Sequence, residues 1–154
     1  MNTLNKIKYM FEIANIKYSI VEHSPTYTSQ ESATQRGDNI RNGAKAIVLK
    51  TDNYFSLIVM SASLKLDSKK VKQCLNLKKL RFATKEELYD MTGLVPGSVP
   101  PFGNPILPFS LYIDSSIIEL EYISFNAGSL TQSISMSKSD YLSMSEGQIV
   151  SVSR

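Results

Sequence analysis

Proline and glycine are concentrated in one short part of the chain, and this feature limits the possible folds most. Five of the six prolines lie between positions 96 and 108, and three of the seven glycines lie between 93 and 103. Proline fixes φ and lacks the N–H that helices and sheets use, whereas glycine adopts conformations that other residues avoid. The segment predicts a rigid loop. Such a loop either simply connects a helix to a strand or aims backbone N–H groups at a ligand oxygen.

Helical and extended patterns alternate irregularly along the rest of the chain. Apolar spacing predicts a helix over 4–14 with Thr3 as its N-cap, and capping-box patterns at Thr28–Glu31 and Thr84–Glu87 open two more helices. A short helix with a serine cap is expected over 68–75. Strands are expected over 18–22, 46–49, 55–59, 109–113, 122–125, 132–136 and 148–152.

The order of these elements predicts the fold class. The runs 46–49 and 55–59 form a hairpin, whose first strand is apolar without alternation and is therefore expected to be buried on both faces. Because regular βαβ alternation is missing, we expect an α+β fold with a mixed, curled, barrel-like sheet and flanking helices. The length of 154 residues predicts one domain over residues 1–154.

The chain has one cysteine, Cys74, and one histidine, His23. No intrachain disulfide can form, and a zinc site of four Cys or His ligands is excluded. A thiol nucleophile with an imidazole base would have to be Cys74 with His23, which is a weak third hypothesis for function. No apolar run approaches the length of a membrane span, and no signal peptide is recognisable. We expect a cytoplasmic protein without membrane contact.

Positive charge gathers in one segment. Seven basic residues and one acid, Asp67, lie between Lys65 and Arg81, although the net charge of the whole chain is only +3. Such a run is either a solvated helix face or a contact for a phosphate backbone. The candidates for nucleic-acid contact are Lys69, Lys70, Lys72, Lys78 and Lys79.

Several short motifs, taken in chain order, resemble the YbaK and prolyl-tRNA synthetase-associated (ProX) family of aminoacyl-tRNA deacylases. The motifs are His23–Pro25, Thr28–Ala33, Gly43–Lys50, Lys78–Ala83, Gly97–Gly103, Asp114, Ala127–Gly128 and Asp140–Leu142. The resemblance spans about residues 16–145. It implies hydrolysis of the ester of a mischarged tRNA, typically alanine or cysteine on proline tRNA, by a water that backbone groups and the substrate's ribose position. It implies no cofactor and no metal. The partners it implies are the tRNA acceptor end and, as a second candidate, a prolyl-tRNA synthetase.

The resemblance also implies roles for individual residues. Lys45 would hold the phosphate of the terminal adenosine, and Gly97, Ser98 and the following amides would stabilise the tetrahedral oxyanion. The residues expected to contact substrate are Val99, Pro100, Pro101, Gly128, Ser129, Thr28 and His23. The family has a polar residue after the lysine, where this chain has Ala46. That difference leaves open an alternative function, a non-catalytic module that binds tRNA or a synthetase.

Overall fold

A long β-hairpin forms the centre of the structure, a computed structural model that describes residues 1–154. Its strands, β2 (Ala44–Thr51) and β3 (Tyr54–Ser61), pair antiparallel. Asp52 adopts the positive φ of 47° that a tight hairpin turn requires. Val48 packs in the larger hydrophobic cluster and its neighbour Leu49 in the smaller one. The predicted hairpin, with a first strand buried on both faces, is confirmed.

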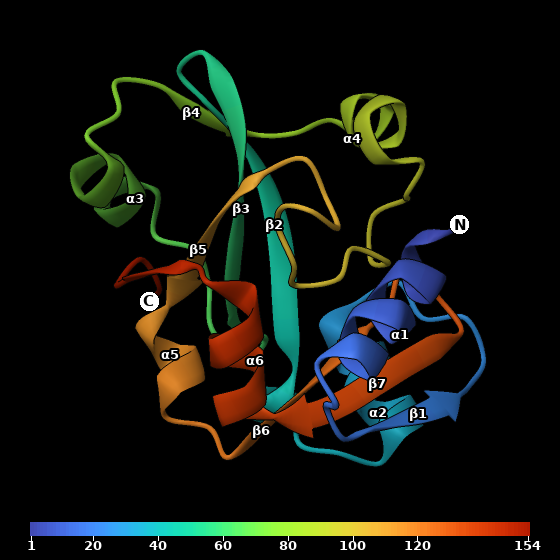
Figure 1. Ribbon diagram of the computed structural model, residues 1–154. Helices are drawn as coiled ribbons and strands as arrows, with labels where there is room; N and C mark the ends of the chain where they lie inside the picture. Colours follow the sequence, from blue (N-terminus) through green and yellow to red (C-terminus); the bar gives the residue numbers. More distant parts are fainter.

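The strands form two sheets (Figure 1). The first has the order β4-β2-β3-β5-β8, with β4 and β2 antiparallel and both β3–β5 and β5–β8 parallel. The second has the order β1-β7-β6 and is antiparallel. Their other strands are β1 (Tyr18–Glu22), β4 (Leu80–Phe82), β5 (Ser110–Asp114), β6 (Tyr122–Asn126), β7 (Gln132–Ser137) and β8 (Gln148–Val150).

The α+β class with a mixed sheet is confirmed, but the predicted barrel-like curl is wrong. The two sheets are open and are joined by one isolated parallel bridge, between Gly43 and Ser124. Beyond this bridge the start of β2 and the end of β6 line a cavity together instead of pairing. The barrel therefore fails to close at the place where the molecule has a pocket.

Six α-helices and one 3-10 helix flank the sheets (Figure 1). Two predicted caps are wrong by one residue. Asn2 rather than Thr3 caps the first helix, and Asp67 rather than Ser68 caps the third, because these side chains accept hydrogen bonds from the first free N–H groups. No helix is long and apolar enough to cross a membrane. The helices are α1 (Thr3–Ile13), α2 (Ser29–Arg36), η1 (Ile40–Asn42), α3 (Ser68–Leu75), α4 (Lys85–Thr92), α5 (Ser115–Ile118) and α6 (Lys138–Ser145).

The loop between α4 and β5 is anchored in the core by an aromatic cluster. Phe102 is buried, and its ring packs edge-on against Phe11 of α1, Phe125 of β6 and Tyr141 of α6, with centroids 5.4–5.9 Å apart. Such edge-to-face pairs stabilise beyond their buried area. One loop residue therefore contacts three elements, and it fixes the loop relative to α1, α6 and the three-stranded sheet.

Asp114, at the end of β5, fastens the C-terminal segment. It is fully buried, and its carboxylate accepts hydrogen bonds from Val152 N (2.8 Å), Ser153 Oγ (2.8 Å) and Ser116 N (3.0 Å). Burial by itself would raise the pKa of Asp114, but these hydrogen bonds outweigh it and hold the pKa below its usual value.

We expect Asp114→Asn to lower the free energy of unfolding by about 1–3 kcal/mol at neutral pH, since the amide would face donors with a donor of its own. A depressed carboxyl pKa stabilises the fold above the unfolded-state pKa and loses this effect as pH falls through the folded pKa. The loss of unfolding free energy caused by Asp114→Asn should therefore be smaller in acid. Urea unfolding at about pH 7 and pH 3 measures it, with the exposed Asp90→Asn as control. An equal loss at both pH values would contradict this role.

Candidate active site

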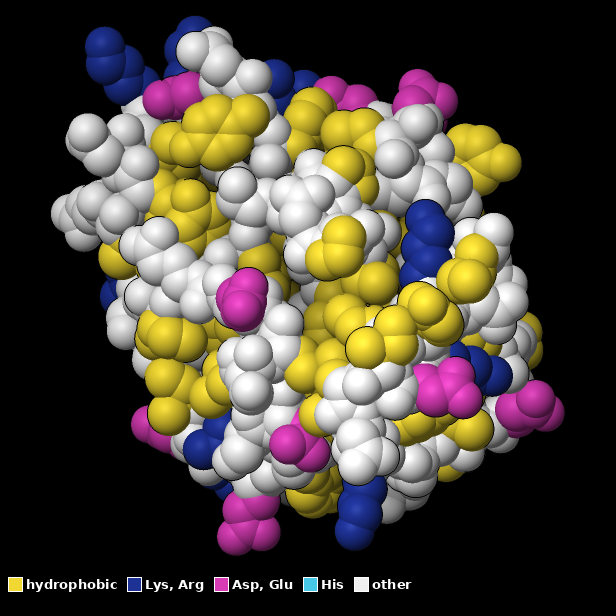
Figure 2. Space-filling model, viewed as in Figure 1, with side chains coloured by type: hydrophobic (Ala, Val, Ile, Leu, Met, Phe, Trp, Pro, Cys, Tyr) yellow, Lys and Arg dark blue, Asp and Glu magenta, His cyan; other side chains and the backbone are white.

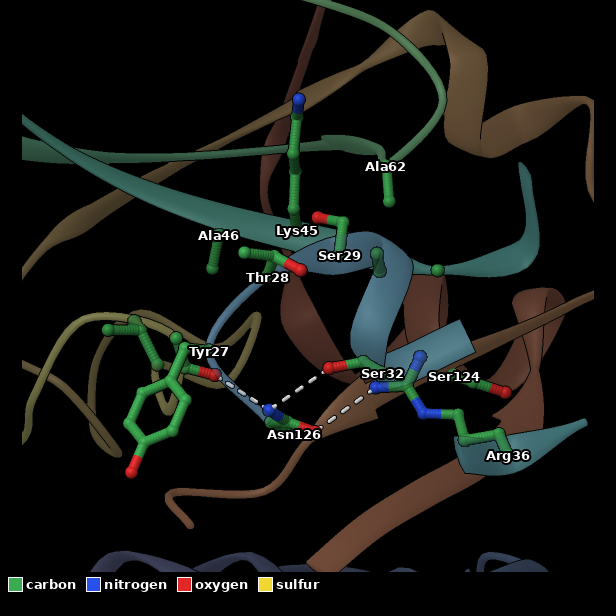
Figure 3. Close-up of a pocket in the computed structure, with 14 residues that line it drawn as sticks. Tyr27, Thr28, Ser29, Ser32, Arg36, Lys45, Ala46, Ala62, Ser124 and Asn126 are labelled. Carbon is green, nitrogen blue, oxygen red and sulfur yellow. Dashed lines mark hydrogen bonds between the residues drawn. The ribbon is translucent and has the colours of Figure 1, made fainter. Parts of the chain in front are cut away.

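A small cavity lies where the two sheets separate. Its volume is about 110 Å³, and Figure 3 shows its lining residues. They come from five places. These are the segment 27–36 with α2, the start of β2 with Gly43 before it, Ala62 after β3, the loop after α4, and the end of β6. Lys45 and Arg36 are the charged residues in the lining, and no carboxylate is present. The cavity thus carries positive charge and suits a ligand with anionic or hydrogen-bond-accepting groups.

The predicted glycine and proline loop supplies one wall through Gly97 and Val99. Gly97 has φ of +91°, and its carbonyl accepts a hydrogen bond of 2.8 Å from Asn126 Nδ2. The carbonyl of Ser98 accepts one of 2.9 Å from Gly128 N. In a planar trans peptide the C=O and the following N–H point in opposite directions. The Val99 N–H, which has no protein partner, therefore points away from Gly128.

Three predicted residues, Ser98, Pro101 and Gly128, make contacts that fix the loop without lining the cavity themselves. Ser98 is buried, and its Oγ donates to Val95 O at 2.7 Å, closing a tight turn. The Pro101 carbonyl accepts a hydrogen bond of 2.7 Å from the Tyr141 hydroxyl. A Cβ on Gly128 would lie 2.9 Å from Thr3 Cβ, so glycine is needed there for α1 to approach. The predicted site residues that do not line the cavity are Ser98, Pro100, Pro101, Gly128, Ser129 and His23.

Lys45 lines the opposite side of the cavity, near the start of β2 (Figure 3). Its Nζ donates a hydrogen bond to the Leu64 carbonyl. No carboxylate lies within 4 Å, since the one ion pair of the structure joins Arg81 to Glu87. Burial, and then the charge of Lys65, lower the pKa of Lys45. Of the predicted residues, Thr28 also lines the cavity, and its Oγ1 caps α2.

Two lining residues that the sequence reasoning missed meet at the cavity floor (Figure 3). Arg36, in the last turn of α2, donates from Nη2 to Asn126 Oδ1 at 3.2 Å and from Nε to Ser133 Oγ at 2.9 Å. Ser133 Oγ in turn donates to Asn126 Oδ1 at 3.0 Å. With its oxygen occupied in this way, Asn126 directs its NH₂ group at Gly97. A basic residue before a helix-ending glycine resembles an ordinary helix terminus, so the sequence signalled no site there.

His23 lies behind the cavity floor. Its Nε2 is 2.7 Å from Ser133 Oγ and its Nδ1 is 2.9 Å from Ser24 O. Cys74 lies on α3 with its Sγ 3.6 Å from Ser151 O, and neither residue lines the cavity. The structure therefore does not bring Cys74 and His23 together. It also forms no group of three His, Cys, Asp or Glu side chains that could hold a metal ion.

We expect Cys74→Ser to keep the full rate of any hydrolysis that the cavity performs, because the thiol is exposed and outside it. The measurement is the rate of each protein on the same substrate, with thermal unfolding as a control for folding. A loss of activity in a folded Cys74→Ser protein would restore the thiol hypothesis.

The basic segment is divided by the fold. Lys72, Lys78 and Lys79 line a concavity of about 460 Å³ together with Lys50 and Arg81. Lys69 and Lys70 are exposed on α3 outside it, and Lys70 Nζ donates to Ser153 O at 2.9 Å. On the face seen in Figure 2, acidic and basic side chains are interspersed. Contact of this segment with nucleic acid stays a prediction.

Comparisons with known proteins agree on one family. The profile of the aminoacyl-tRNA editing domain matches residues 23–144. The multifunctional Ser/Thr-tRNA deacylase ProXp-y of Escherichia coli (strain K12) is 28% identical over 143 residues, which cover 89% of this chain and 84% of that protein. The prolyl-tRNA editing protein ProX of Acetoanaerobium sticklandii is 30% identical over 90 residues, covering 57% of this chain and 55% of the relative.

Longer proteins and solved structures extend the comparison. The proline–tRNA ligase of Shouchella clausii is 32% identical over 100 residues, covering 65% of this chain but 17% of the ligase. The crystal structure of a proposed trans-editing enzyme for prolyl tRNA synthetase superposes with a TM-score of 0.84 at 22% identity, covering 100% of this chain and 98% of the other. At that identity the likeness concerns the fold.

Proposed function

The chain belongs to the aminoacyl-tRNA editing domain family, and from this premise we propose that residues 1–154 act as one domain that removes a wrong amino acid from tRNA in trans. Water adds to the carbonyl of the aminoacyl ester, the bond to the ribose oxygen breaks, and free amino acid and uncharged tRNA leave. The relatives named as a tRNA deacylase and a prolyl-tRNA editing protein support this reaction class.

The observation that carries the proposal is the peptide between Ser98 and Val99. Its carbonyl accepts a hydrogen bond from Gly128 N, and its N–H has no protein partner. Because Val99 and Gly97 line the cavity, we infer that this N–H faces it. A fixed N–H group that faces the developing oxyanion lowers the barrier, and one such donor is worth about 2.7–4 kcal/mol. This role needs neither imidazole nor thiolate.

The other groups of the cavity fit the two ends of such a substrate. The Lys45 ammonium, which has no carboxylate partner, would bind the phosphate of the terminal adenosine as a point charge. A cavity of about 110 Å³ is far below the roughly 300–1,000 Å³ of drug-sized pockets, which favours a small amino acid. Alanine and cysteine are implied by the sequence resemblance, and serine and threonine by the Escherichia coli relative.

A panel of mischarged tRNAs tests this function. The panel consists of proline tRNA and other tRNAs, each charged with alanine, cysteine, serine or threonine. The aminoacyl ester should be hydrolysed faster in the presence of the protein than spontaneously. Absence of acceleration across the whole amino-acid panel would refute the proposal. The alternative, a binding module, predicts salt-dependent binding of uncharged tRNA with no turnover. The methyl group of Ala46 in the cavity lining is the feature that favours this alternative.

A further inference from the structure

Arg36 is a charged lining residue with N–H groups that no protein acceptor uses. The guanidinium is fixed on two edges, by Ser133 Oγ and by Asn126 Oδ1. Its Nη1, with two N–H groups, has no protein acceptor, and a Cβ on the neighbouring lining residue Gly43 would lie 3.8 Å from it. The side chain is thus fixed through Nε and Nη2, while both N–H groups of Nη1 have no protein acceptor at the cavity wall.

The charge of Arg36 is also without a direct counterion. No carboxylate lies within 4 Å of it, and the nearby Asp38 instead accepts hydrogen bonds from Asn42 and from the Tyr122 hydroxyl. Burial lowers the pKa of Arg36 to about 10, although Asp38 acts in the opposite direction. The guanidinium remains charged at neutral pH, and its Nη1 is open to solvent. A ligand oxygen that takes the place of water there would form a charge-assisted hydrogen bond.

The remaining polar groups near Arg36 are already paired. Ser32 Oγ bonds with Thr26 Oγ1 at 2.8 Å, and Ser124 Oγ with Ser135 Oγ at 2.7 Å. Asn126 is committed to Gly97. At this end of the cavity the free donor is therefore Arg36 Nη1.

The proposed function determines which part of the substrate reaches this donor. If the ester lies at Val99 and the terminal phosphate at Lys45, the amino-acid side chain is left to extend toward Arg36. Figure 3 shows Arg36 and Lys45 on different sides of the cavity. The positive guanidinium disfavours the α-ammonium group there, so that group is excluded as its ligand.

We propose that Arg36 is a specificity-determining residue whose Nη1 donates a hydrogen bond to an oxygen on the side chain of the amino acid that is removed. This inference rests on the proposed function and narrows it to oxygen-bearing side chains, a hydroxyl or a carboxylate. A site that hydrogen-bonds a substrate oxygen discriminates against the analogue that lacks it, because the site's own donor is then left unpaired.

The test compares hydrolysis of one tRNA that carries serine, alanine, threonine, valine or aspartate. The wild-type protein should remove serine roughly tenfold or more faster than alanine in kcat/KM, and threonine faster than valine by a similar factor. The aspartate arm identifies whether a carboxylate is the better acceptor. If alanine is removed as fast as serine and aspartate, the inference is wrong without any variant being needed.

Variants then assign the preference to Arg36. Arg36→Met and the milder Arg36→Lys should bring the serine-to-alanine ratio toward one, and the ratio is unaffected by a general loss of activity. Arg41→Gln, at an exposed arginine outside the cavity, is the matched control and should keep the ratio. An unchanged ratio in a folded Arg36→Met protein, which lacks any donor at this position, would overturn the assignment. If no ester at all is hydrolysed, the proposed function fails instead, so the two failures are distinguishable.

Discussion

Gly97→Val should reduce deacylation about 100-fold or more, because one oxyanion donor is worth roughly 10²–10³ in kcat. Gly97 has φ of +91°, a conformation that a β-branched residue avoids. Its new Cβ would also lie 3.2 Å from Tyr27 O and 3.4 Å from Leu130 Cδ2. The peptide must turn to relieve these contacts, which breaks the bond from Asn126 to the Gly97 carbonyl and moves the adjacent Val99 N–H.

Gly93→Val is the matched control for this prediction. Gly93 also has a positive φ, 72°, but it ends α4 and a Cβ there would meet nothing within 4 Å. Both variants carry the backbone strain of a non-glycine residue at positive φ, about 1–2 kcal/mol. Deacylation rates and urea unfolding of the two proteins separate strain from catalysis. A folded Gly97→Val protein as active as Gly93→Val would show that the loop has no catalytic role.

The sequence predicted the elements whose signals are local. The capping box at Thr84 is present, with Thr84 Oγ1 accepting from Glu87 N and Glu87 accepting from Thr84 N. The box at Thr28 is half formed, since the Glu31 carboxylate accepts from Tyr27 N instead. Side chains within four residues of a helix start decide such caps. The parallel pairings β3–β5 and β5–β8 had no local signal, because they depend on packing between distant segments.

The same distinction applies to the site. Lys45, Gly97, Val99 and Thr28 reach one cavity, as the motif order suggested. Arg36 was missed, because its partner Asn126 is 90 positions away and neither residue has a local pattern of its own. Of the six predicted residues outside the lining, Ser98, Pro100 and Pro101 belong to the loop itself, Gly128 bonds to it, and His23 bonds to Ser133 behind the cavity floor. Motifs locate such a region, whereas the direction in which each group points depends on long-range hydrogen bonds.

Lys45→Ala should lower kcat/KM for mischarged tRNA by roughly 10–100-fold, the range that a hydrogen bond to a charged group provides. The loss should appear mainly as a higher KM, since a phosphate distant from the ester is bound equally in the ground state and the transition state. Lys17→Ala is the matched control. Lys17 is exposed and lies outside both the cavity and the basic concavity.

The pH dependence separates a charge contact at Lys45 from a merely structural one. Burial and the charge of Lys65 lower the pKa of Lys45, so its ammonium is lost earlier than that of an ordinary lysine as pH rises. The KM obtained from rates corrected for spontaneous ester hydrolysis should therefore rise as the pH becomes alkaline. Lys65→Gln removes the like charge, raises the pKa of Lys45 and should move this rise to higher pH. A KM that stays flat on the alkaline side in both proteins would mean that Lys45 acts through packing and not through its charge.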